Sequence, residues 1–207
     1  MKGLVIVVVA VLSIAILIEV VAIGGAWVLH RQGRFADEIA WLQGLQPIMV
    51  WDRALDGQID RLYRERVRAE LDADRLDRAV QALRLARGRS LARGLKADAD
   101  LTSLGIETFT RAADRLEAHG QLERAADWDD SLFVFAVRAQ EAHHRFAAVA
   151  AFVEGLDLRV RAGNPCGALD RVVWAKRGLG GEIPGFQPSV EEDLATQCRA
   201  ARRNRRG

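Results

Sequence analysis

The sequence predicts an all-α protein, with a single N-terminal transmembrane helix followed by stacked helical hairpins. Three observations predict this fold class. One apolar run is long enough to cross a membrane, Ala, Leu and Arg dominate the composition, and apolar residues recur at helical spacing in most of the remaining chain. Ala, Leu and Arg have high helix propensity, whereas the β-branched residues concentrate in the apolar run. The 207 residues suffice for one anchor and one ordinary domain.

The pattern divides the chain into four segments. We predict a transmembrane anchor over 1–33, a juxtamembrane amphipathic helix over 34–50, a helical-hairpin domain over 51–178, and a final segment over 179–207. The final segment combines a Gly/Pro-rich loop, a C-terminal helix and a basic tail. The juxtamembrane helix either lies along the membrane surface or is the first helix of the domain.

The anchor is an apolar run over residues 4–29 that contains one charged residue. About 20 apolar residues cross the hydrocarbon layer, and Trp27, His30 and Arg31 follow at the position of a membrane interface. A cleaved signal peptide is the alternative, with small residues over 24–26 near a cut. The run exceeds the roughly 7–15 apolar residues of a signal peptide, which favours an uncleaved anchor.

The charged residue of the anchor is Glu19, near the middle of the run. An ionised carboxylate at that depth costs free energy unless it faces protein or water. Gly24 and Gly25 follow closely and would let another helix approach. Two interpretations stay open: a polar residue tolerated in a single span, or a contact of Glu19, Gly24 and Gly25 with another membrane subunit.

The orientation of the anchor is inferred from its flanking charges, the short N-terminal tail and the two cysteines. Lys2 opposes Arg31 and Arg34, so the flanking basic charges nearly balance. A short tail before a long apolar run usually stays in the cytoplasm, which places the domain outside. Cys166 and Cys198 could form a disulfide in an oxidising compartment, or remain two free thiols. We therefore expect a single-pass protein of a bacterial inner membrane, with the domain in the periplasm.

Within 51–178, apolar residues three and four apart predict consecutive helices. Asp74 is predicted to cap one helix, Gly120 to end a later one, and the turn over 163–167 to separate two more. The densest apolar patch is expected in the core; it consists of Phe133, Val134, Phe135 and Val137.

Three similar stretches, over 76–80, 122–126 and 169–173, each follow a turn signal and predict stacked hairpins. The middle unit resembles a tetratricopeptide repeat over about 34 residues. The resemblance rests on four positions: Ala113, Leu116, Gly120 and Ala125. Leu132 departs from the pattern, because the family usually has a small residue at that position. The resemblance implies helical hairpins that bind proteins. A tetratricopeptide-like α-solenoid and an irregular helical bundle both stay open.

Catalytic and metal-binding patterns are weak. His143 and His144 are adjacent on a helix, so their imidazoles point about 100° apart and cannot share one ion. Asp127, Asp129 and Asp130 are expected to be solvated or to cap a helix. Phosphate-binding loops and a nucleophile elbow are absent from the sequence. We expect no enzyme activity, no metal or other cofactor, and no small-molecule substrate.

Residues 179–188 are predicted to be loop because Gly and Pro are dense there. Ser189 and Glu192 then form a capping-box pattern that starts the last helix. A concentrated basic run follows, made of Arg199, Arg202, Arg203, Arg205 and Arg206. This run either contacts anionic lipid headgroups or an acidic partner, or is a solvated tail. The chain's net charge of +2 gives no general argument for nucleic acid, and RNA becomes an option only if the domain is cytoplasmic.

The leading hypothesis is a membrane-anchored helical scaffold or adaptor that serves as an accessory subunit of a larger membrane complex. Its partners would be the lipid bilayer and other membrane protein subunits. A freestanding periplasmic module that binds peptides or proteins is the first alternative, and an unrecognised enzyme is the second. A groove lined by exposed side chains would favour the binding module, and an apolar patch continuous with the anchor would favour the subunit.

Overall fold

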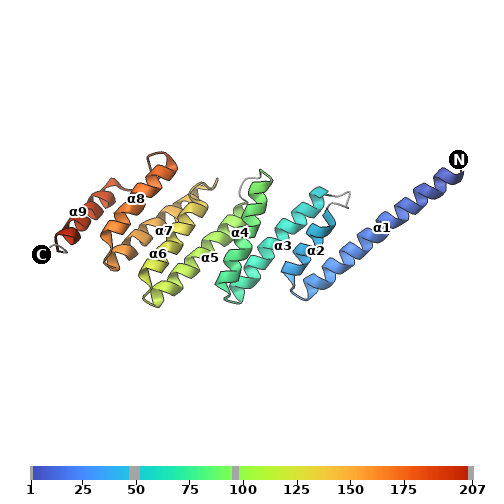
Figure 1. Cartoon of the computed structure of the whole chain (residues 1–207), viewed down its shortest axis with the longest axis horizontal. Helices are drawn as coiled ribbons and strands as arrows, with labels where there is room; N and C mark the ends of the chain where they lie inside the picture. Colours follow the sequence, from blue (N-terminus) through green and yellow to red (C-terminus); the bar gives the residue numbers. More distant parts are fainter. Residues whose placement is uncertain (1, 47–51, 95–97, 205–207) are drawn as a thin grey trace. The chain divides into compact units, whose positions relative to one another are not determined.

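The structure, a computed structural model, describes the backbone of residues 2–46, 52–94 and 98–204, and the side chains of these except 2–12, 14, 15 and 52–54. The regular elements in these ranges are helices, with no strand among them, which confirms the predicted all-α class (Figure 1). The chain forms two compact units, residues 1–73 and residues 74–207. The first unit holds α1 (Lys2–Arg31), α2 (Phe35–Leu45) and α3 (Asp52–Asp72). The second holds α4 (Leu76–Ala92), α5 (Ala99–Ala118), α6 (Leu122–Ala136), α7 (Ala142–Arg161), α8 (Pro165–Leu179) and α9 (Pro188–Asn204).

In the first unit, α2 packs against both α1 and α3. The helical spacing of the apolar residues explains this packing, because each helix buries one stripe. The buried stripes consist of Ala22 and Ala26 from α1, Ile39 and Leu42 from α2, and Leu55, Ile59 and Leu62 from α3. The predicted juxtamembrane helix therefore lies against the C-terminal half of α1 in this unit.

Trp41 fixes the contact between α1 and α2. Its indole N–H donates to the carbonyl oxygen of Ala22 over 3.2 Å. A Cβ at Gly25 would lie 3.0 Å from three atoms of the same ring, whereas a Cβ at Gly24 would meet nothing within 4 Å. Gly25 thus admits the indole of α2 from the same chain, a neighbour that the sequence pattern did not identify.

In the part of the chain that the structure describes, none of the helices has both the length and the apolar character needed to traverse a bilayer.

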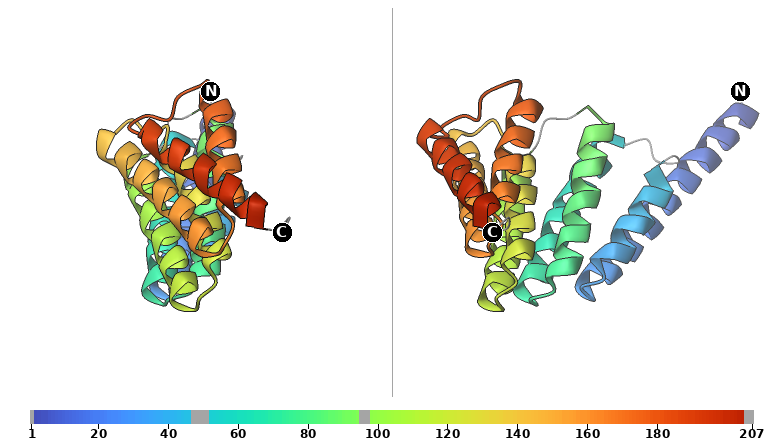
Figure 2. Two further views of the ribbon diagram at one scale, coloured as in Figure 1. Left: turned by 90° about the vertical axis from the view of Figure 1, so that its left-hand side faces the viewer. Right: turned by 60° about the vertical axis from the view of Figure 1, so that its left-hand side comes forward.

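In the second unit, each helix packs on the next, and α5 also contacts α7 (Figure 2). Tight turns produce this order because Gly120 and Gly163 take left-handed φ angles of 70° and 79° after α5 and α7. The core between α6 and α7 includes a stacked pair, Phe133 and Phe152, with ring centroids 4.5 Å apart. Other fully buried side chains of this unit are Leu83, Leu132, Leu156, Leu158 and Val172.

Three local predictions are wrong. Asp74 does not cap α4, because Arg75 holds that position and Asp74 adopts a left-handed φ of 55° while its carboxylate pairs with Arg115. Val134 is 54% exposed, since it lies on the side of α6 opposite the core. Ser189 lies inside α9 instead of capping it, because the helix already begins at Pro188.

The aspartate cluster is also different from the prediction. Asp127 is exposed as expected, but Asp129 and Asp130 are buried, at 4% and 3% exposure. Asp130 contacts Arg159 of α7 and Arg171 of α8, whereas Asp129 faces α7 and lies near the charge of Arg159. Burial of these two carboxyls raises the pKa of each.

Candidate functional site

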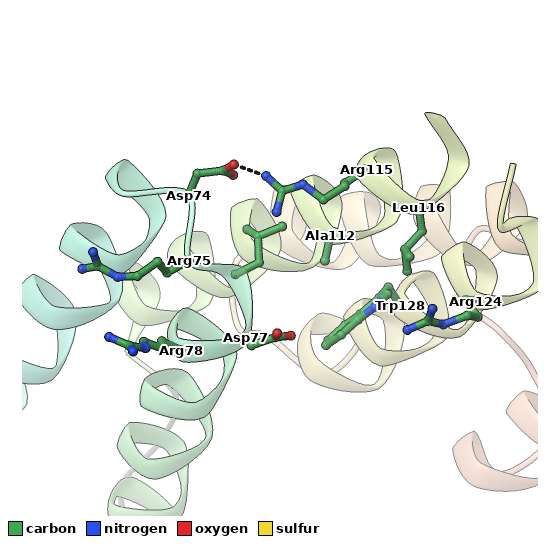
Figure 3. A pocket seen from close by; sticks show the side chains of 10 residues that line it. Asp74, Arg75, Asp77, Arg78, Ala112, Arg115, Leu116, Arg124 and Trp128 are labelled. Carbon is green, nitrogen blue, oxygen red and sulfur yellow. Dashed lines mark hydrogen bonds and ion pairs between the residues drawn. The ribbon is translucent and has the colours of Figure 1, made fainter. Parts of the chain in front are cut away.

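A cavity of about 550 Å³ in the second unit opens between the start of α4, the C-terminal part of α5 and the start of α6 (Figure 3). We call it the Trp128 groove. Ten residues line it: Asp74, Arg75, Leu76, Asp77, Arg78, Ala112, Arg115, Leu116, Arg124 and Trp128. Most of these side chains are exposed, so the groove is an open surface feature.

The floor of the groove is apolar. Ala112 and Leu116 project from one face of α5, and Leu76 comes from the first turn of α4. Trp128 is half-buried and packs against the buried side chain of Phe109, whose ring centroid lies 5.7 Å from that of the indole. An aromatic side chain held in this way offers a large, rigid contact surface at a low entropic cost.

The rim of the groove is charged, with four guanidinium groups and two carboxylates. Arg115 pairs with Asp74, and Arg124 donates from Nη1 to Oε1 of Gln121 over 2.5 Å. Figure 3 shows Asp77 and Arg124 on opposite sides of Trp128, while Arg75 and Arg78 extend away from the indole. The rim carries more positive than negative charge.

Two helix N-termini add to this positive field. α4 and α6 both begin at the groove, and neither Arg75 nor Gln121 makes a side-chain cap hydrogen bond. A helix N-terminus carries a partial positive charge and unpaired N–H groups that favour anions. The apolar floor, the excess of guanidinium groups and the helix ends together suit a ligand with one apolar and one acidic group.

A buried ion-pair network lies elsewhere in the same unit. Arg159 of α7 donates from Nη2 to Asp130 over 2.7 Å and to Asp127 over 2.8 Å. Arg171 of α8 places its Nε 2.7 Å from the same oxygen of Asp130. Burial raises the pKa of the Asp130 carboxyl, and the two guanidinium groups oppose that rise. This network joins three helices, so its role is structural.

Ser103, His144 and Glu141 form a hydrogen-bonded chain that the sequence did not predict. The Nε2 atom of His144 lies 2.9 Å from Oγ of Ser103, and its Nδ1 lies 3.2 Å from Oε2 of Glu141. The order resembles a nucleophile, a base and an acid. Ser103 lies within α5, however, where backbone N–H groups bond along the helix and cannot form an oxyanion hole. The hydrogen bonds of Ser103, His144 and Glu141 therefore link α5 to the start of α7.

A cavity of about 510 Å³ lies in the first unit, between α1, α2 and α3. One half is apolar, with Ile23, Trp27 and Leu62 among its lining residues. The other half is charged: Glu38 is buried, and its Oε2 lies within hydrogen-bonding distance of Nδ1 of His30, at 3.1 Å. Burial raises the pKa of Glu38, and the contact with His30 opposes the rise.

The residues predicted from the sequence do not gather at a single site. Glu19 is half-buried on α1, in the same unit as Gly24 and Gly25. Cys166 and Cys198 are joined in a disulfide with an S–S distance of 1.96 Å, which links α8 to α9. Exposed basic side chains on α9 are Arg199, Arg202 and Arg203, whereas Arg205 and Arg206 lie outside the described residues.

Sequence reasoning missed the Trp128 groove. Its signal was present, since Arg124 and Trp128 are four residues apart and therefore share one face of α6. Ala112, Arg115 and Leu116 share one face of α5 for the same reason. What the pattern could not supply was the arrangement that brings these faces together at the start of α4.

Among the residues that the structure describes, no three His, Cys, Asp or Glu side chains are arranged to hold a metal ion. No protein-family model, curated protein sequence or solved structure matches the chain.

Proposed function

We propose that the protein is a membrane-anchored helical adaptor that holds an acidic segment of a partner protein in the Trp128 groove. The observation that carries this proposal is the groove itself, with its apolar floor and its excess of guanidinium groups. An extended segment with one apolar side chain against Trp128 and an acidic side chain near Arg124 would complement both features. Aromatic and arginine side chains contribute most of the binding energy in many protein interfaces.

The anchor is the second part of the proposal. From Ala22 onward α1 packs against α2, because Ala22 and Ala26 are buried and Trp41 donates to the Ala22 carbonyl. We propose that α1 spans the membrane within the apolar run over residues 4–29, which is longer than the roughly 20 residues that a spanning helix needs. Trp27 and Arg31, whose guanidinium lies 5.3 Å from the indole, would stand at the interface.

An exposed apolar face of α1 supports the role of a subunit in a larger membrane complex. Its exposed large side chains are Ile16, Leu17, Val20, Val21, Ile23, Trp27 and Val28. Either lipid or a helix of another subunit would cover such a face. Glu19 favours a helix of another subunit, because a carboxylate within the bilayer costs less free energy against protein than against lipid. We propose that Glu19 contacts another membrane subunit.

The arrangement of the second unit supports stacked hairpins of the tetratricopeptide kind. The resembling stretch coincides with α5 and α6, which are joined by the turn at Gly120 and pack on each other. The disulfide between Cys166 and Cys198 supports an oxidising compartment such as the periplasm. An adaptor is favoured over an enzyme because the hydrogen bonds of Ser103, His144 and Glu141 link α5 to the start of α7, which is a structural role.

Selection of peptides tests the groove. The purified full-length protein in mild detergent would be presented with a random hexapeptide library, and bound peptides would be sequenced. We expect enrichment of peptides with an apolar residue next to Asp or Glu. The variants Trp128→Ala and Arg124→Glu should each lower the affinity for an enriched peptide by about tenfold or more, the usual loss when a central interface residue is removed.

Arg177→Glu is the matched control, since Arg177 is exposed on α8 and does not line the groove. It makes the same charge change and should leave peptide affinity unaltered. Enrichment of basic peptides, or equal losses in all three variants, would refute the groove proposal.

Alkaline carbonate extraction of native membranes tests the anchor. A spanning helix keeps the protein in the membrane pellet, whereas a protein held only by charge is released. Replacing Glu19 with Leu should leave the protein in the pellet but change the set of proteins that co-purify in mild detergent. An unchanged set would refute the subunit contact of Glu19.

A further inference from the structure

A second cavity of the second unit lies on a different face of α5. It has a volume of about 210 Å³ and opens between α5, α6 and α7. Its lining residues are Ile106, Thr110, Ala113, Asp114, Glu117, Asp129, Leu132, Ala147, Ala150, Ala151, Glu154 and Leu158. We call it the Asp129 cleft. It shares no lining residue with the Trp128 groove, so each can be tested without the other.

The ionisable groups that line the cleft are all acidic. Asp114 and Glu117 come from α5, Asp129 from α6 and Glu154 from α7. Glu117 already has a partner, because Nη1 of Arg161 lies 2.7 Å from its Oε1. The other three carboxyls repel one another, since Glu154 and Asp114 both act on Asp129. Three helices thus direct negative charge towards one small volume.

Asp129 distinguishes this cleft from an acidic surface. The residue is 4% exposed, and its Oδ2 atom is buried with no hydrogen-bond partner. A buried polar atom without a partner costs about 1–3 kcal/mol, so such atoms are uncommon and mark places where a ligand or water completes the site. Asp129 lines the cleft, so a hydrogen-bond donor of a ligand that enters between α5 and α7 would reach its carboxyl.

The remaining walls are apolar and narrow. Ile106, Leu132 and Leu158 contribute aliphatic groups, and Ala147 and Ala150 contribute methyl groups along α7. An aliphatic stem fits such walls, and an ammonium or guanidinium head would then meet the carboxyls. A strongly hydrated inorganic cation would gain nothing from the aliphatic walls.

We propose that the Asp129 cleft binds an organic cation with an aliphatic stem, such as the side chain of a lysine or arginine. The cation would donate to the carboxyl of Asp129 while its stem packs between α5 and α7. Its source is either a basic residue of a partner protein or a free alkylamine, and both share this chemistry. The proposal goes beyond the acidic-segment adaptor and does not depend on it.

The protonation state of Asp129 couples binding to pH. Burial, with the nearby carboxyls of Glu154, Asp130 and Asp114, raises its pKa from 3.8 to about 7, and Arg159 opposes the rise. A cation binds the ionised carboxylate, so affinity should increase as pH rises from 6 to 8. By linkage, binding below pH 7 should release a proton.

Calorimetric titration of the full-length protein tests the proposal with three probes. They are the blocked tripeptide acetyl-Ala-Lys-Ala-amide, its neutral analogue with Gln in place of Lys, and butylammonium chloride. We expect the lysine tripeptide or butylammonium to bind at pH 8 at least about tenfold more tightly than the neutral analogue. The tighter of the two cations identifies the source as a protein side chain or a free amine.

Two variants locate the binding. Asp129→Asn keeps the shape of the side chain and should weaken the cation by about tenfold or more, and Glu154→Gln, at the exposed rim, should weaken it by less. Asp157→Asn is the control, because Asp157 is an exposed carboxylate of α7 that does not line the cleft. Circular dichroism confirms that each variant is folded. Equal affinity in Asp129→Asn and the parent, or no saturable binding of either cation, would overturn the proposal.

Discussion

Arg159 of α7 and Asp130 of α6 form a buried ion pair in which Nη2 donates to Oδ2 over 2.7 Å. Their side chains are only 4% and 5% exposed. Arg171 of α8 contacts the same carboxylate oxygen at 2.7 Å, so one aspartate joins three consecutive helices. Such a pair contributes little net stability compared with an apolar core, but removal of one partner leaves a buried charge uncompensated.

Replacing Arg159 with Ala should therefore destabilise the second unit by about 3–5 kcal/mol, the usual cost of breaking a buried pair. Urea denaturation followed by circular dichroism measures the loss. Arg161→Ala is the control, because Arg161 lies on the same helix but its ion pairs with Glu117 and Asp157 are largely exposed. Similar urea midpoints for the two variants would show that the Asp130 network does not stabilise the second unit.

Asp129 should make stability depend on pH. Its pKa is about 7 in the folded protein, above the value of 3.8 for a free carboxyl. Between these values the folded state binds more protons than the unfolded state, so the free energy of unfolding falls as pH rises from 4 to 7. Asp129→Asn should flatten this part of the profile, as measured by thermal unfolding at several pH values. Asp157→Asn should keep the parent's slope, and a parental slope in Asp129→Asn would contradict the assignment.

Gly155 allows α6 and α7 to approach closely. A Cβ at this position would lie 2.9 Å from Cβ of Asp129 and 3.3 Å from the carbonyl oxygen of Ala126. Gly155→Ala should cost about 1–3 kcal/mol because backbone must shift. Gly88→Ala is the matched control in α4, since a Cβ there meets nothing within 4 Å. It should stabilise the protein by about 0.5–1 kcal/mol through helix propensity, and a loss of stability there would undermine the comparison.

The disulfide between Cys166 and Cys198 should hold α9 to the start of α8. Replacing both cysteines with Ser should destabilise the second unit by about 2–4 kcal/mol, because the open chain gains entropy when unfolded. Mass spectrometry of the non-reduced protein, with and without thiol alkylation, reports the bond directly. Two alkylated thiols in protein isolated from cells would contradict both the bond and the oxidising compartment.

Much of the helical order was predictable from local sequence. The turns at Gly120 and Gly163 follow from glycine conformations and apolar spacing, which act within one turn of helix. Asp74 shows the limit of such rules. It has the residue type of an N-cap, yet its carboxylate is used by Arg115 from α5, and Arg75 occupies the cap position. A partner 41 residues away in sequence cannot be seen in a local pattern.

The sequence by itself determined the all-α class, most helix positions and the apolar run over 4–29, because propensity, turn chemistry and hydropathy are properties of short segments. Tertiary structure alone decided which faces meet. It buried Asp129 and Asp130 against α7, placed Trp128 beside the start of α4, and filled the space at Gly25 with Trp41. Burial and charge pairing arise between helices, so no residue's own identity determines them.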